Sequence, residues 1–126
     1  MSVNDMREHY KNAGHYFDLA NKAQDSRTRG YYQQAAEKEH IKAYEATDKA
    51  KQDVMTKACW DAKEYYDKAA EAYEKGDMKA YQNYNDQGHK IMAEAKEKQT
   101  EIQKEADMAE AETRSKSEDL QRGRYH

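Results

Sequence analysis

Apolar residues recur at intervals of three and four along most of this chain, and polar stretches interrupt them at only a few places. Side chains three and four residues apart lie on one face of an α-helix, so each such run predicts a helix with a single apolar face. The pattern therefore predicts an all-α protein.

The two clearest runs lie on either side of Gly76 and Asp77. The first run comprises Ala58, Ala62, Tyr65, Ala69 and Ala72, and the second comprises Tyr81, Tyr84, Gly88, Ile91, Ala95 and Ile102. Glycine readily adopts the left-handed conformation that ends a helix, and aspartate accepts hydrogen bonds from the free amides of the next helix. We therefore predict a long antiparallel helical hairpin with its turn at Gly76-Asp77.

An earlier run predicts a first helix that begins near residue 3, with Ser2 and Asp5 forming a weak variant of the capping box. Its apolar stripe comprises Met6, Tyr10, Ala13, Phe17, Ala20 and, at its end, Ala23. Residues 24–30 include glycine, serine and aspartate but no apolar side chain, so we place a connection there. Ser26 or Thr28 is the expected cap of the next helix.

Residues 31–75 contain no strong stop signal, although their middle, residues 47–53, is polar. We favour one long helix, and two shorter helices that break near Asp48 or Asp53 are the alternative. The last predicted helix runs from Met78 to about Ala111. We expect residues 1–112 to form an antiparallel bundle of about three helices, and the polar residues 113–126 to form a disordered tail.

The composition indicates a thin core. Val, Ile, Leu and Phe number only eight in 126 residues, and 19 Ala, 11 Tyr and six Met take their place. Apolar burial stabilises by about 25 cal/mol per Å², so an alanine and tyrosine seam contributes less than a leucine core. Gly14 and Gly88 lie inside helical runs and are expected to mark close contacts between helices. We expect modest stability, or further burial against a partner or a second copy.

The charges are nearly balanced, with 22 basic and 25 acidic residues, so no long-range field attracts nucleic acid or an anionic membrane. No stretch approaches the roughly 18 apolar residues of a membrane span, and the first residues lack the apolar region of a signal peptide. The single cysteine, Cys59, excludes an internal disulfide and fits a reducing compartment. We expect a soluble, cytoplasmic chain that binds neither nucleic acid nor membrane.

The segment KAAEAYEKGDMKAYQNYNDQGHKIMAEAKEK, within residues 59–106, resembles a helical region of unknown function that precedes the small MutS-related (Smr) domain in eukaryotic proteins. The matching positions are Lys68, Ala69, Glu71, Ala72, Tyr73, Gly76, Asp77, Ala80 and Gly88. The resemblance implies a helical hairpin that is accessory to another element. Residues after 106 hold no Smr domain, so the nuclease role of that domain is not carried over.

Two pairs, Glu37 with His40 and Asp86 with His89, have the Glu-x-x-His type of spacing found in di-iron bundles. A metal site would also need carboxylates from other helices, for which Glu8, Asp18 or Glu64 could serve. A solvated helix face accounts better for such pairs, because 37% of the residues are charged. We therefore predict no metal and no cofactor.

Cys59 lies near Lys57 and Lys63, and cations lower the pKa of a thiol. A small residue beside Trp60 is the simpler interpretation of this cysteine. The sequence contains no glycine-rich phosphate loop, cysteine pair or nucleophile elbow, so we predict that the chain is not an enzyme.

The tyrosines around the turn recur at helical spacing, which is typical of packing or of a binding surface, because tyrosine is enriched at interface hot spots. We predict a non-catalytic helical module for protein–protein interaction. The predicted partner-binding residues are Trp60, Tyr65, Tyr66, Tyr73, Tyr81 and Tyr84. The alternatives are a homo-oligomeric coiled-coil protein and a ferritin-like metal-binding bundle.

Overall fold

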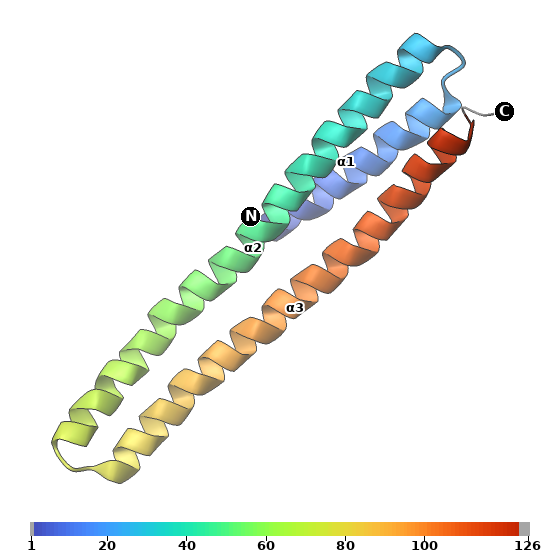
Figure 1. Ribbon diagram of the computed structural model, residues 1–126. Helices are drawn as coiled ribbons and strands as arrows, with labels where there is room; N and C mark the ends of the chain where they lie inside the picture. The colour runs from blue at the N-terminus through green and yellow to red at the C-terminus, as the bar shows by residue number, and fades with distance from the viewer. Residues whose placement is uncertain (1, 124–126) are drawn as a thin grey trace. The chain divides into compact units, whose positions relative to one another are not determined.

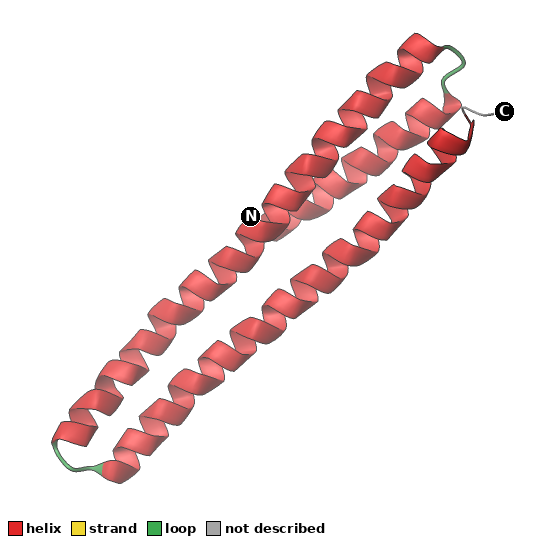
Figure 2. Cartoon of the chain, viewed as in Figure 1, coloured by secondary structure: helices red, strands yellow, loops and turns green. Residues whose placement is uncertain are grey.

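The computed structural model describes residues 2–123, which form three α-helices and no strand (Figures 1 and 2). The helices are α1 (Ser2–Lys22), α2 (Ser26–Glu74) and α3 (Met78–Gly123). The predicted all-α class and the predicted number of helices are confirmed. Within residues 2–123, no helix combines the length and the apolar character needed to cross a membrane.

Helix α2 passes through the polar stretch 47–53 without a break, which confirms the single long helix. Thr47 is buried there, and its hydroxyl donates a hydrogen bond to the carbonyl of Ala43 at 2.8 Å. A threonine satisfied in this way can occupy a position in the buried stripe. Further along, Ala50 is buried, and the carbonyl of Lys51 accepts a hydrogen bond from the side chain of Gln99 at 2.9 Å.

The chain divides into two compact units. The first unit contains the residues up to Ala50 and those from Ile102 onward, and we call it the three-helix unit because it includes α1. The second unit, Lys51–Glu101, contains the end of α2, the turn and the start of α3, and we call it the hairpin unit.

In the three-helix unit, α1 runs antiparallel to α2. His9 binds Glu39 at 2.6 Å, and the ring of Tyr16 stacks on that of Tyr32 with centroids 6.3 Å apart. Residue numbers therefore fall along α2 as they rise along α1. The apolar stripe predicted for α1 is buried from Met6 to Ala20, whereas Ala23 lies beyond the end of α1 and is half-buried. This stripe supplies much of the core of the unit.

The disordered tail predicted for residues 113–126 is wrong for residues 113–123, because α3 continues to Gly123 instead of ending near Ala111. Leu120 is 2% exposed and packs in a buried cluster. Its companions in that cluster are Phe17, Ala20 and Ala36. Thr113 is also buried, and its hydroxyl donates to the carbonyl of Ala109. Residues 124–126 lie outside the described residues.

The connection between α1 and α2 is shorter than the predicted residues 24–30, because α2 already begins at Ser26. The expected caps, Ser26 and Thr28, are wrong, since Asp25 fills this role. Its carboxylate accepts hydrogen bonds from the backbone N–H of Thr28 at 2.7 Å and from the Thr28 hydroxyl at 2.9 Å. These bonds stabilise the charged carboxylate and lower the pKa of Asp25.

The turn between α2 and α3 forms as predicted. Gly76 has a φ of 77°, its N–H donates to the carbonyl of Tyr73, and the N–H of Asp77 donates to the carbonyl of Ala72. These two bonds form a Schellman motif, which ends α2 and satisfies its last carbonyls. The carboxylate of Asp77 then accepts the N–H of Ala80 at 3.1 Å and caps α3.

The hairpin unit has a seam of small buried residues. Its buried members are Ala58, Ala62, Ala69, Ala72, Gly88 and Ala95. Small side chains allow two helix backbones to approach closely, and the predicted seam is confirmed for these small members. Larger residues of the predicted seam, such as Tyr65, Tyr81 and Ile91, are only half-buried.

Candidate interaction surface

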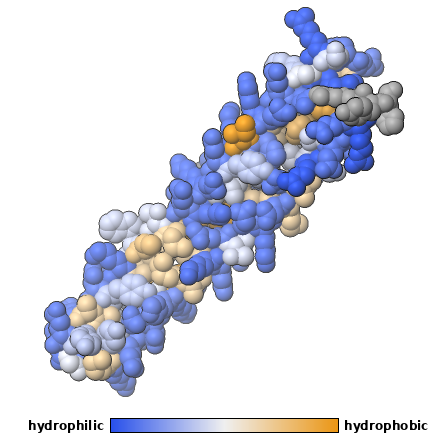
Figure 3. All heavy atoms as spheres, in the orientation of Figure 1, coloured by the Kyte–Doolittle hydropathy of each residue, from blue (hydrophilic) through white to orange (hydrophobic). Residues whose placement is uncertain are grey.

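The largest side chain of the hairpin unit points outward. Trp60 lies on α2 and is 70% exposed. It borders a hollow of about 340 Å³ whose other lining residues are Met55, Thr56, Cys59 and Lys63. Figure 3 shows mildly hydrophobic atoms gathered on the visible face of the hairpin unit, among a mostly hydrophilic surface. Cys59 is exposed, and the ammonium group of Lys63 binds Asp67 at 2.7 Å.

Tyr73 and Tyr81 form a second feature beside the turn. Their rings meet edge to face with centroids 5.4 Å apart, and Tyr73 is 60% exposed. Tyr73 also accepts, through its carbonyl, the hydrogen bond from Gly76 that ends α2. The turn therefore fixes the backbone of this ring pair while most of the Tyr73 side chain stays in solvent.

Tyr66 crosses from α2 to α3 over Gly88. A Cβ atom added at Gly88 would lie 2.6 Å from the nearest atom of the Tyr66 ring, so only glycine leaves room for the ring at this position. The Tyr66 hydroxyl lies 3.0 Å from Nδ1 of His89, and the two rings meet edge to face. The close contact predicted at Gly88 is confirmed.

Tyr65 and Tyr84 lie beside a different partner, Lys68. The ammonium group of Lys68 sits 5.7 Å from the centroid of the Tyr65 ring and 5.9 Å from that of Tyr84, within the range of a cation–π contact. Successive residues of an α-helix point about 100° apart, and the adjacent residues Tyr65 and Tyr66 contact different partners.

The six predicted partner-binding residues therefore form separate groups rather than one patch. Tyr73 pairs with Tyr81, Tyr65 and Tyr84 share Lys68, Tyr66 contacts His89, and Trp60 borders its own hollow. Sequence reasoning missed the contributions of Lys68 and His89. The helical period of 3.6 residues indicates that adjacent tyrosines point in different directions, but nothing in the sequence marks Lys68 and His89 as their partners.

The proposed metal pairs do not converge on a common centre. Within residues 2–123, no group of three or more His, Cys, Asp or Glu side chains is arranged to hold a metal ion. His40 stacks on Tyr44 with ring centroids 4.8 Å apart, and His89 is bonded to Tyr66 and Asn85. Among the other nominated carboxylates, Asp18 pairs with Lys116 and Glu64 with Lys68.

A polar cluster in the three-helix unit surrounds Glu110. Its carboxylate accepts hydrogen bonds from the Tyr44 hydroxyl and from Arg114, beside a cavity of about 300 Å³ that His40 and Phe17 also line. The bond to Glu110, with some burial and the carboxylate charge, raises the pKa of Tyr44 to about 12. The phenol of Tyr44 is therefore protonated at neutral pH and donates its hydrogen bond to Glu110.

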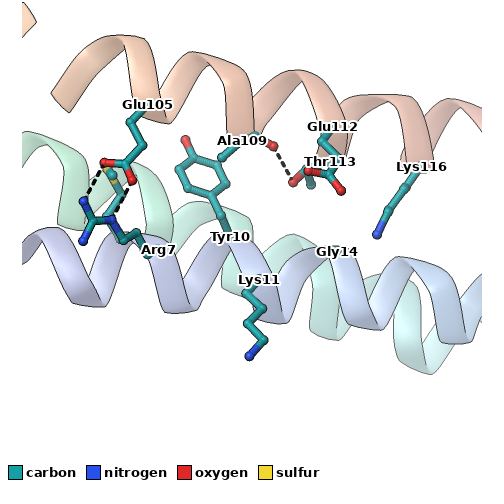
Figure 4. A pocket seen from close by; sticks show the side chains of 10 residues that line it. Arg7, Tyr10, Lys11, Gly14, Glu105, Ala109, Glu112, Thr113 and Lys116 are labelled. Atoms are coloured by element: carbon teal, nitrogen blue, oxygen red, sulfur yellow. Dashed lines mark hydrogen bonds and ion pairs between the residues drawn. The ribbon is translucent and has the colours of Figure 1, made fainter. Parts of the chain in front are cut away.

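A groove of about 310 Å³ lies between α1 and α3 in the same unit (Figure 4). Arg7 binds Glu105 at 2.6 Å, a bond that raises the pKa of Arg7, and Lys116 binds Asp18 at 2.9 Å. Lys116 passes over Gly14, where an added Cβ would lie 3.3 Å from its nitrogen. These ion pairs link α1 to α3, and the neighbour of Gly14 is the end of the Lys116 side chain rather than a helix backbone.

Comparison of the chain with family models, curated proteins and solved structures gave no match. The resemblance of residues 59–106 to the helical region that precedes Smr domains therefore stays a prediction from the sequence.

Proposed function

We propose that this chain is a non-catalytic helical module that binds another protein through exposed aromatic side chains of the hairpin unit. The proposal rests on one observation: small side chains of the hairpin unit are buried, and two of its large aromatic side chains are exposed. Alanines fill the seam, whereas Trp60 and Tyr73 are 70% and 60% exposed. Aromatic side chains can bury about 150–250 Å² each, so their exposure leaves substantial apolar area available for a partner.

The Tyr73 and Tyr81 pair is the part of this surface best prepared for binding. Edge-to-face packing restrains both rings, and the Schellman turn restrains the backbone beside them. A side chain that is ordered before binding loses less conformational entropy in the complex. Tyrosine and tryptophan are also the residues that most often dominate binding energy at interfaces.

Self-association through the alanine seam is the alternative, and the burial of that seam within one chain argues against it. Ala62 and Ala69 are 1% and 2% exposed, so little of their surface remains for a second copy. The exposed rings are therefore better candidates for an interface than the seam.

Photocrosslinking tests the proposal. A photoreactive phenylalanine analogue replaces Tyr73 in the cells that produce the protein, and a matched chain carries it at Met108, which is 75% exposed in the three-helix unit. We expect a discrete crosslinked protein from position 73 only, and weaker binding of that protein by Tyr73→Ala or Tyr81→Ala chains of unchanged helicity. The same adducts from both positions, or unchanged affinity in both variants, would refute the proposal.

A further inference from the structure

The hollow beside Trp60 is shallow and open, and α2 alone lines it. Thr56, Cys59, Trp60 and Lys63 all line it, and they stand at positions i, i+3, i+4 and i+7 of α2. Residues three and four apart are neighbours on a helix surface, so these four residues form the corners of one diamond-shaped patch on α2. In coiled coils, four residues of one helix form the hole into which a side chain of the facing helix inserts.

We propose that this hollow receives one large apolar side chain from an amphipathic α-helix of a partner protein. This inference rests on the proposed function and names the kind of partner. The hollow of about 340 Å³ has room for a leucine, methionine or phenylalanine side chain, and the Trp60 ring and Met55 supply apolar walls. All of its lining residues come from α2, and its outer side is open.

The exposed area favours one docked helix over a second copy of the chain. Trp60 is 70% exposed, and an aromatic side chain buries about 150–250 Å² when fully covered. A stable interface of standard size buries about 800 Å² from each partner. One ring with Met55 and Cys59 beside it provides only a fraction of that area, which suits a single anchoring helix.

The charge at the rim specifies a further property of the partner. Lys63 lies at one end of the hollow and pairs with Asp67 at 2.7 Å, but the two side chains are 63% and 65% exposed. Exposed ion pairs of this kind are weak, so Lys63 can exchange Asp67 for a carboxylate on the partner. The bound helix therefore carries Glu or Asp about one turn from its apolar anchor.

A peptide-display selection tests this assignment. The probe is a library of tryptophan-free amphipathic helical peptides with the anchor and its flanking positions randomised, and the bait is the full chain. Trp60 is the only tryptophan, so its fluorescence reports directly on filling of the hollow. Trp60→Ala is the test variant, Met108→Ala is the control at another exposed apolar residue, and Tyr73→Ala probes the turn.

We expect enriched peptides to carry a large apolar anchor with an acidic residue one turn away. They should shift the Trp60 emission to shorter wavelength and bind Trp60→Ala about tenfold or more weakly, with no change for Met108→Ala. Peptides that depend on Tyr73 and not on Trp60 would overturn the inference and leave the proposed function standing. Binding that neither substitution weakens counts against both. A dimer that dissociates on Trp60→Ala would place a second copy in the hollow and also overturn the inference.

Discussion

Replacing Gly88 by alanine should destabilise the hairpin unit, although alanine is the better helix former. The added methyl group would lie 2.6, 2.8 and 3.0 Å from three atoms of the Tyr66 ring. These distances are too short for contact between carbon atoms, so the ring has to move. Its movement breaks the edge-to-face contact with His89 and the interaction of the Tyr66 hydroxyl with Nδ1.

Two opposing effects set the size of the change. Gly→Ala inside a helix stabilises by about 1 kcal/mol, because glycine has more conformational freedom in the unfolded chain. Inserting a methyl group into a packed site costs about 1–3 kcal/mol. The difference predicts a net loss of roughly 1 kcal/mol in the free energy of unfolding for Gly88→Ala.

Urea unfolding followed by circular dichroism measures this change, and Gly30 provides a matched control. Gly30 also lies inside a helix, but an added Cβ there has no atom within 4 Å. Gly30→Ala should therefore stabilise the chain by about 1 kcal/mol. The two substitutions are chemically identical, so opposite signs isolate the contribution of the Tyr66 ring.

A double mutant makes the reasoning refutable. In a Tyr66→Ala background the ring is gone, so Gly88→Ala should change sign and stabilise by about 1 kcal/mol. If Gly88→Ala stabilises the otherwise unchanged chain as much as Gly30→Ala does, the close approach of Tyr66 to α3 is refuted.

Three further substitutions test other parts of the structure. Leu120→Ala should lower the free energy of unfolding in urea by about 2–5 kcal/mol, because it opens a cavity in a buried cluster. Arg122→Ala, at an exposed position, should change that free energy little, and equal effects of the two substitutions would contradict the packing of the last turns of α3. Asp25→Ala should lower the melting temperature at pH 7, because the lowered pKa of Asp25 means that its charged carboxylate stabilises the folded chain. The difference should be complete above the usual aspartate pKa of 3.8 and should be lost as the pH falls through the lower pKa of the folded state, and a difference that stays constant in acid would count against the cap. By NMR titration, the phenol of Tyr44 should ionise near pH 12 in the unchanged chain and close to pH 10 in Glu110→Gln. The hydrogen bond from Tyr44 to Glu110 should stabilise the fold fully below pH 10, and this stabilisation should be lost as the pH rises through 12. An unchanged titration in the variant would exclude the bond to Glu110.

The hairpin could be predicted from the sequence because its signals are local. A left-handed glycine followed by a capping aspartate specifies the turn, and the alanine spacing specifies the seam. Asp25 was missed as a cap because the whole stretch of residues 24–30 is polar and several of its side chains can cap a helix.

The end of α3 could not be predicted because its burial depends on residues distant in the sequence. Leu120 is one leucine among polar neighbours, and only the packing of Phe17 and Ala36 against it makes the last turns part of the core. Thr113 counts as a polar position in the sequence pattern, yet it is buried, because its hydroxyl donates a hydrogen bond to the carbonyl of Ala109 in the preceding turn.

The separation of the aromatic residues also required the structure. Spacing placed Tyr65, Tyr66, Tyr73 and Tyr81 near the turn, but their partners come from the other helix of the hairpin or from side chains such as Lys68. Sequence spacing within one helix carries no information about which residue of the facing helix lies opposite.

Light scattering behind a sizing column, at two protein concentrations, tests most directly whether the exposed rings are left for another protein. If the seam closes within one chain, the measured mass should stay at the 14.8 kDa of a monomer at both concentrations. A mass that rises toward that of a dimer with concentration would contradict closure within one chain, and self-assembly would replace binding to another protein as the leading account of function.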